Sequence, residues 1–173
     1  MTNKLDVHFS SERKDWETPW ELFIELDEEF TFTLDVCAEK HNSKLPNFFS
    51  PEDDGLKQDW GDNICWMNPP YGDPEFPCKP NCKKKMCKKR GYHNDVYVPG
   101  IIDWVQKAYE ESLKGATVVC LLPARTCTKW FREFIYSKAS EIRFLKGRLK
   151  FVGAKHSAPF PSMIVVFRNI KEG

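Results

Sequence analysis

The chain has 173 residues, of which 41% are hydrophobic, and its 13 Phe and 6 Trp provide enough apolar material for one domain with a packed core. The apolar run 116–122 is far too short to cross a bilayer, and the polar segment 1–13 lacks the apolar stretch of a signal peptide. These features predict a cytoplasmic protein with no membrane association, and no obligate protein partner is evident. Seven cysteines form an odd set, and four of them (Cys37, Cys65, Cys120 and Cys127) accompany apolar segments, which predicts reduced thiols.

The net charge of +1 conceals an uneven distribution. Residues 79–90 carry seven basic side chains and no acidic one, which leaves 26 − 7 = 19 basic against 25 acidic residues elsewhere. Such a concentrated positive field predicts a polyanionic partner. The alternative is a solvated surface loop.

The first half of the chain predicts a flexible tail over 1–15 and then a single domain over 16–173. Thr18 and Pro19 resemble the cap and first position of a helix over 20–30. A short buried strand is expected over 32–37, a brief strand over 47–49, and another strand over 63–67 that ends just before Asn68. The segment 73–99, rich in Pro, Cys and Lys, interrupts this pattern and indicates an insertion.

The second half predicts an amphipathic helix over 101–113, a buried strand over 117–122 and a helix over 128–137. Two further strands, 141–145 and an antiparallel 163–167, complete the pattern. Strands that alternate with helices predict an α/β, Rossmann-like doubly wound sheet. In such sheets ligands collect at the carboxyl ends of the strands, where Asp35 and Asn68 are expected.

The tetrapeptide Asn68-Pro69-Pro70-Tyr71 indicates a specific chemistry. The nitrogen of an exocyclic amine on adenine is a poor nucleophile because its lone pair is delocalised into the ring. The Asn68 side-chain oxygen and the Pro69 carbonyl can accept its two N–H bonds and localise that pair, while the prolines fix the carbonyl direction. Tyr71 is expected to stack on the base. The tetrapeptide therefore predicts methyl transfer from S-adenosylmethionine to an amino nitrogen, with a plain strand-to-turn exit as the alternative.

Several further stretches match a known family in order. The chain resembles the phage-type DNA N6-adenine methyltransferases, a Dam-like family of bacteriophages and prophages, over nearly all of 16–167. The resemblance implies a single methyltransferase domain, S-adenosylmethionine as methyl donor, double-stranded DNA as substrate and the host cytoplasm as location. The matching stretches are Trp16-Glu17-Thr18-Pro19, Leu34-Asp35-Val36-Cys37-Ala38, Asp54-Gly55-Leu56 with Trp60, Asn68-Pro69-Pro70-Tyr71-Gly72, Leu122-Pro123-Ala124-Arg125-Thr126, Gly147-Arg148-Leu149-Lys150-Phe151 and Ala158-Pro159-Phe160-Pro161-Ser162.

The resemblance also implies the residues that contact the cofactor. Thr18, Pro19, Asp35, Cys37, Asp54 and Asn68 are the expected set. The chain departs from most methyltransferases because no Gly-rich turn follows its first strand. Asp35 could instead cap a strand end, and Asp54 could be a turn acid beside Gly55.

Cys78, Cys82, Cys87 and His93 provide three thiols and an imidazole within sixteen residues. This ligand set fits tetrahedral zinc, which would order a segment that has no apolar core. The alternatives are incidental surface thiols, or a metal held by Cys78 and Cys82 with a ligand from elsewhere.

The insertion follows the tetrapeptide, so it is expected at the mouth of the active site with its cations on DNA phosphates. Arg125 and Arg148 follow strand ends and are expected to contact the DNA backbone, with ordinary surface ion pairs as the alternative. Two other functions fit the same residues: a methyltransferase for an RNA base or a protein glutamine, and an inactive zinc-dependent DNA-binding module. The expected DNA contacts are Lys83, Lys84, Lys85, Lys88, Lys89, Arg90, Arg125 and Arg148.

Overall fold

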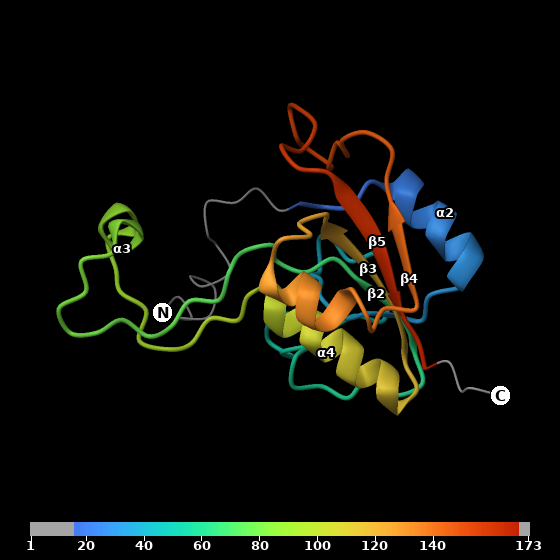
Figure 1. Ribbon diagram of the computed structural model, residues 1–173, viewed down its shortest axis with the longest axis horizontal. Helices are drawn as coiled ribbons and strands as arrows, with labels where there is room; N and C mark the ends of the chain where they lie inside the picture. The colour runs from blue at the N-terminus through green and yellow to red at the C-terminus, as the bar shows by residue number, and fades with distance from the viewer. Residues whose placement is uncertain (1–15, 170–173) are drawn as a thin grey trace.

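The computed structural model describes residues 16–169, and the expected flexible tail over 1–15 lies outside them. These residues form a mixed α/β body built on a five-stranded sheet, from which one long insertion projects (Figure 1). The strands are β1 (Leu34–Asp35), β2 (Ile64–Met67), β3 (Thr117–Pro123), β4 (Glu141–Phe144) and β5 (Ser162–Phe167). The helices are α2 (Trp20–Phe30), α3 (Lys85–Arg90), α4 (Ile101–Lys114) and a π-helical turn η1 (Phe131–Ile135).

The sheet has the strand order β1-β2-β3-β5-β4. Strands β1, β2 and β3 are parallel, whereas β5 runs antiparallel to both of its neighbours, as the sequence predicted. Strand β4 therefore points in the same direction as β1, β2 and β3. As a consequence, the carboxyl ends of four strands meet at one edge of the sheet.

A helix covers each face of the sheet. Trp66 and Val166 lie on one face, because the register aligns both with Val119, and Phe167 lies on the other. Helix α2 covers the first face through Phe23, whose ring lies 5.6 Å from that of Trp66. Helix α4 covers the second face through Tyr109, 6.2 Å from the Phe167 ring. The fold is therefore a three-layer α/β arrangement.

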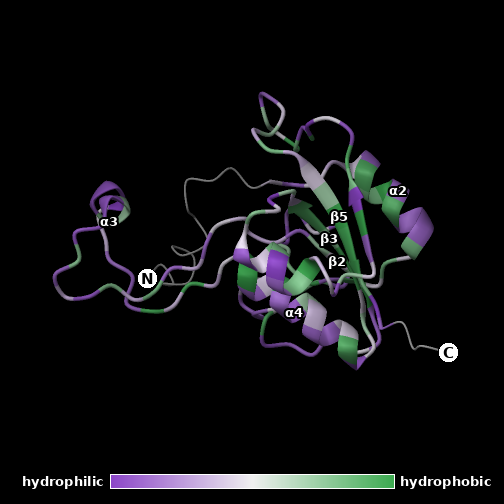
Figure 2. Ribbon diagram, viewed as in Figure 1, coloured by the Kyte–Doolittle hydropathy of each residue, from purple (hydrophilic) through white to green (hydrophobic). Residues whose placement is uncertain are grey.

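The central strands are largely apolar, while the insertion is mostly hydrophilic (Figure 2). All six residues of β5 and six of the seven in β3 are buried, which explains why both read as continuous hydrophobic runs in the sequence. Among residues 16–169, no helix is both long and apolar enough to pass through a bilayer.

Four local predictions are corrected. Thr18 does not cap α2, because the N-cap position is Pro19 and no side chain bonds to the first turn. The helix expected over 128–137 contains a π-turn, in which the Tyr136 N–H bonds to the Phe131 carbonyl five residues back. The strand expected over 32–37 is paired only at Leu34 and Asp35, and the brief strand near 48 is a single bridge from Phe48 to Asp35.

Candidate active site

Four segments converge on the carboxyl edge of the sheet. Asp35 ends β1, Asn68 follows β2, and the segment after β3 begins at Ala124. The segment that precedes α2 joins them, because the Asn68 side chain bonds to Trp16 and Thr18. The fold thus places the tetrapeptide beside the acid that ends the first strand, as the sequence predicted.

The carboxamide of Asn68 is fixed at both ends. Its Nδ2 donates to the carbonyl oxygen of Trp16 at 2.6 Å and to Oγ1 of Thr18 at 3.0 Å. Its Oδ1 accepts a hydrogen bond from the hydroxyl of Tyr71 at 2.7 Å. Both N–H donors are therefore engaged, whereas Oδ1 keeps a second lone pair for another donor.

The two prolines and Tyr71 differ in their exposure. Pro69 is buried and Pro70 is exposed, and within residues 16–169 the Pro69 carbonyl accepts no hydrogen bond. The Tyr71 ring is only 4% exposed, and its hydroxyl also lies 3.2 Å from the Leu121 carbonyl. In this structure Tyr71 thus contacts Asn68 through its hydroxyl, and stacking on a base stays a prediction.

An aromatic cluster surrounds Tyr71. The Trp16 ring lies 5.1 Å from Phe151 and 5.3 Å from Phe160, and Tyr71 lies 6.3 Å and 5.7 Å from the same two rings. The rings meet in tilted and edge-on orientations, which are favourable for aromatic pairs. The guanidinium of Arg125 lies over the Phe160 ring at 5.4 Å. This cluster joins the segment before α2 to the β4–β5 connection.

Asp35 is 2% exposed, and both of its carboxyl oxygens accept backbone hydrogen bonds. The donors are the N–H of Cys37 at 3.4 Å and that of Lys44 at 3.0 Å. Burial raises the pKa of this carboxyl to about 6, although the two N–H groups act in the opposite direction. Asp35 therefore closes the loop 37–44, which has no Gly-rich turn.

Lys44 ties this loop to the segment before α2. Its side chain is 2% exposed, and its Nζ lies 3.0 Å from a carboxylate oxygen of Glu17 and 4.2 Å from the centre of the Trp20 ring. Nothing in the sequence around Lys44 indicated this buried pair.

Asp54 lies in a turn that packs against the first strand. It has a left-handed backbone with φ 54°, and its carboxylate pairs with Lys57 at 2.7 Å. The next residue, Gly55, approaches the carbonyl oxygen of Val36 so closely that a side chain would clash. Asp54 is thus held near the end of β1.

The insertion leaves the body on a two-stranded stalk. At its base the Ile101 N–H bonds to the Gly72 carbonyl at 2.8 Å, and Glu75 and Val98 exchange two hydrogen bonds of 2.9 Å. Helix α3, which contains Cys87, lies at the far end, away from the sheet (Figure 1). The base of the insertion, rather than its tip, is therefore next to the tetrapeptide.

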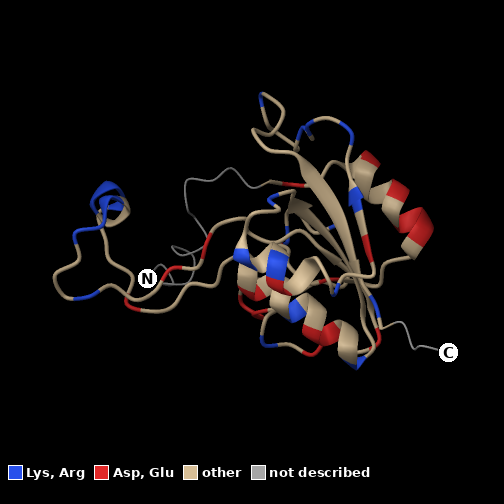
Figure 3. Ribbon diagram, in the orientation of Figure 1, with Lys and Arg blue, Asp and Glu red and all other residues tan. Residues whose placement is uncertain are grey.

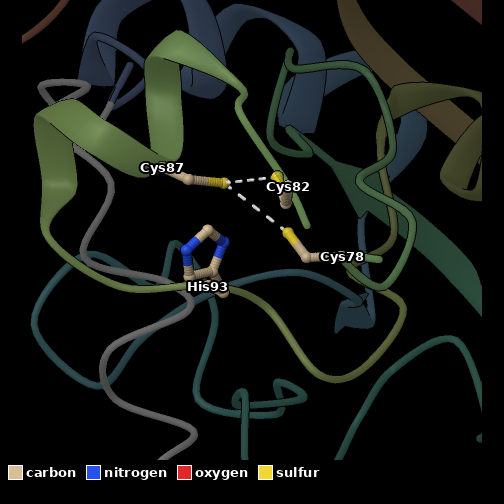
Figure 4. Close-up of side chains that lie close together, drawn as sticks. All are labelled: Cys78, Cys82, Cys87 and His93. Carbon is tan, nitrogen blue, oxygen red and sulfur yellow. Dashed lines mark hydrogen bonds between the residues drawn. The ribbon is translucent and has the colours of Figure 1, made fainter. Parts of the chain in front are cut away.

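The four predicted metal ligands come together at this tip (Figure 4). The ligand atoms of Cys78, Cys82, Cys87 and His93 all lie within 4.8 Å of one another. The Cys87 sulfur lies 3.5 Å from that of Cys78 and 3.7 Å from that of Cys82. A disulfide would need about 2.05 Å, whereas two thiolates on one tetrahedral zinc, each about 2.3 Å from it, lie about 3.8 Å apart. The cluster therefore has dimensions that fit a metal.

Neighbouring groups support the cluster. Arg90 donates to the Cys87 sulfur at 3.5 Å and pairs with Glu75 at 2.8 Å, and Glu75 also accepts from Asn94 at 2.6 Å. Hydrogen bonds from the Lys84 N–H and from the other cluster residues lower the pKa of Cys82 to about 7, which favours its thiolate, whereas burial and the neighbouring thiols raise the pKa of Cys87. Arg90, predicted to contact DNA, thus bonds within the insertion in this structure.

The remaining predicted DNA contacts are exposed. Basic residues dominate the tip of the insertion (Figure 3). Arg125 and Arg148 are exposed in the segments that follow β3 and β4. The exposed lysines of the insertion are Lys79, Lys83, Lys84, Lys85, Lys88 and Lys89.

Comparison with known proteins identifies the family. The family model described as DNA N-6-adenine-methyltransferase (Dam) matches residues 7–173. The chain belongs to this family. It is 31% identical to a DNA N-6-adenine-methyltransferase of Haemophilus phage HP1 (strain HP1c1), over 91% of this chain and 80% of the relative. It is 27% identical to one of Escherichia phage T1, over 91% of this chain and 64% of that relative. The resemblance inferred from the ordered motifs is confirmed.

The raised pKa of Asp35 predicts an unusual dependence of stability on pH. The unfolded carboxyl ionises near 3.8 and the folded one near 6, so the folded state becomes less stable as the pH rises through this window. The unfolding free energy of the wild type, minus that of Asp35→Asn, should fall by about 2 kcal/mol between pH 4 and pH 7. Urea titrations at several pH values measure this difference.

Asp53→Asn provides the control. Hydrogen bonds from Ser50 lower the pKa of Asp53, so the corresponding difference should rise with pH. A difference for Asp35 that is flat or rises with pH would contradict the role given to its burial.

Proposed function

We propose that this protein transfers the methyl group of S-adenosylmethionine to N6 of adenine in duplex DNA. Membership of the DNA N-6-adenine-methyltransferase family supports the reaction and the substrate. The observation that carries the mechanism is the fixed Asn68 carboxamide, whose Oδ1 retains a free lone pair. Helices on both faces of the sheet and a site at its carboxyl edge support a Rossmann-like methyltransferase fold.

The substrate amine would be held by two acceptors. Asn68 Oδ1 and the Pro69 carbonyl would each take one N–H of adenine, which localises the nitrogen lone pair outside the ring. S-adenosylmethionine supplies a methyl group on a positively charged sulfur when it is bound. The proton leaves after transfer without a strong base, because the methylated amine is acidic. The work of the protein is thus to orient the amine and to keep its acceptors rigid.

The residues proposed to hold the cofactor surround this point. Thr18 and Pro19 precede α2, Asp35 ends β1 and Cys37 follows it, and Asp54 lies in the turn packed on Val36. Their placement around Asn68 at one edge supports this assignment. Because adenine N6 lies inside the duplex, the base must be flipped out to reach these groups.

We also propose that Cys78, Cys82, Cys87 and His93 bind zinc. The sulfur spacings and the lowered pKa of Cys82 support a thiolate-rich tetrahedral ligand set. The metal would order an insertion whose lysines contact DNA phosphates.

Replacement of Asn68 by alanine should abolish methyl transfer. The variant lacks the acceptor, and removing one such preorganised group lowers the rate by roughly 100- to 1,000-fold. Transfer of a radiolabelled methyl group to duplex DNA measures the rate, and titration of the cofactor confirms that the variant still binds it. Undiminished turnover in Asn68→Ala would contradict the mechanism.

Thr18 should affect turnover through Asn68. Thr18→Val removes the hydroxyl that accepts from Asn68 Nδ2, so the amide loses part of its orientation and kcat should fall by about tenfold. Thr18→Ser keeps the acceptor and should restore most of the activity. Comparison of kcat with cofactor affinity for the three proteins separates this role from cofactor binding, which would change the affinity instead.

Removal of the metal should unfold the insertion. We expect one zinc per chain by elemental analysis, and its loss in Cys87→Ser or after treatment with a strong chelator. Cys127→Ser is the matched control, because Cys127 is exposed and lies outside the cluster, so its zinc content should match that of the wild type. Protein purified without bound metal, with an insertion equally resistant to proteolysis, would refute the zinc assignment.

A further inference from the structure

The connection between β4 and β5, residues 145–161, lies at the same sheet edge as Asn68. Strand β4 points toward that edge and β5 starts from it, with Ser162 paired to Pro123 at the end of β3. The Leu145 N–H bonds to the Ser162 carbonyl at 3.0 Å, and the Ala124 N–H bonds to the Pro161 carbonyl at 2.8 Å. Both ends of the connection are therefore tied to the edge that carries the candidate active site.

The connection is also anchored along its length. Phe151 and Phe160 are buried and pack on Trp16 and Tyr71. The Val152 N–H bonds to the Glu17 carbonyl at 3.0 Å, and the Ala158 N–H bonds to the Leu149 carbonyl at 2.8 Å. The segment is thus held on the body by groups that contact the tetrapeptide.

The connection carries several exposed cations. Residues 145–161 contain four Lys and Arg side chains, Lys146, Arg148, Lys150 and Lys155, and no acidic residue. All four are exposed, and none forms a hydrogen bond or an ion pair with another group in residues 16–169. Figure 3 shows this connection with blue segments and no red ones.

Several basic side chains elsewhere in the body are paired with carboxylates. Arg143 in β4 pairs with Glu29 and Glu141, each at 2.6 Å, and Lys107 and Lys114 both bond to the buried Glu111 at 2.7 Å. Four unpaired cations on a fixed segment therefore carry an uncompensated positive field beside the active site.

We infer that the β4–β5 connection is a second phosphate-binding surface, on which Lys146, Lys150 and Lys155 join Arg148 to hold the duplex beside the flipped adenine. This inference rests on the proposed function, since it assigns a further contact to the same DNA substrate. The insertion leaves the same edge in another direction (Figure 1), so the two basic segments would contact separate stretches of the backbone. Such contacts add affinity and register without reading sequence.

The test is the dependence of DNA affinity on salt, measured without S-adenosylmethionine. Each phosphate contact contributes about 0.9 to the slope of log affinity against log salt concentration. For Lys146→Gln/Lys150→Gln/Lys155→Gln we expect a slope smaller than that of the wild type by about 2 to 3, and affinity at moderate salt lower by roughly tenfold or more. Methyl transfer at low salt and saturating DNA should stay near the wild-type rate, because none of the three contacts the tetrapeptide.

Two matched proteins control for charge and folding. Lys138→Gln removes one cation that precedes β4, at the opposite edge of the sheet, and should leave the slope unchanged. The triple Lys→Arg protein keeps the charges and should retain the wild-type slope. An unchanged slope in the triple Gln variant, or tighter binding of the wild type to duplex RNA of the same sequence, would overturn the inference. Absence of DNA methylation by the wild type would instead reject the proposed function.

Discussion

The candidate active site depends on one constraint: the carboxamide of Asn68 must keep a single orientation. A terminal amide exchanges its oxygen and nitrogen with a half-turn of its last torsion, and the two orientations present opposite chemistry to a bound amine. Trp16 and Thr18 accept from one end of this amide and Tyr71 donates to the other. Each of these groups is held in turn by the aromatic cluster or by the start of α2. The groups at this edge of the sheet therefore act together to hold the Asn68 side chain in place.

Segments that are far apart in the sequence contribute to the position of Asn68. The segment before α2 provides acceptors, the β4–β5 connection provides Phe151 and Phe160, and Lys44 joins the loop 37–44 to Glu17. Asp35, buried and bonded to two backbone N–H groups, shapes the loop in which many methyltransferases use glycines. In this loop the Asp35 carboxylate fixes the backbone by accepting hydrogen bonds from its N–H groups.

Periodicity and local chemistry were enough to predict most of the fold. Long apolar runs located β3 and β5, amphipathic spacing located α4, and the start signal at Thr18 and Pro19 located α2. The four residues of the Cys/His cluster were recognised from their side-chain chemistry alone. The family expected from the ordered motifs is confirmed. The sequence could not reveal the partners of Thr18, which was mistaken for a helix cap, or the buried Lys44–Glu17 pair, because those contacts arise only when distant segments meet. Likewise, no local pattern in the sequence indicates that Glu75 pairs with Val98 at the base of the insertion.

The closure of the stalk has a consequence for how the chain loses its structure. Gly72 and Ile101 are hydrogen-bonded to each other, so the sheet and its helices form a continuous unit whether or not the intervening residues are ordered. The tip shares no apolar core with that unit, and under the proposed zinc assignment Cys78, Cys82, Cys87 and His93 would hold it together as metal ligands. With zinc bound as proposed, heating should therefore melt two parts independently. The stability of the sheet and its helices depends on burial of apolar surface, and that of the tip depends on the free zinc concentration. A single melting temperature would not describe such a molecule.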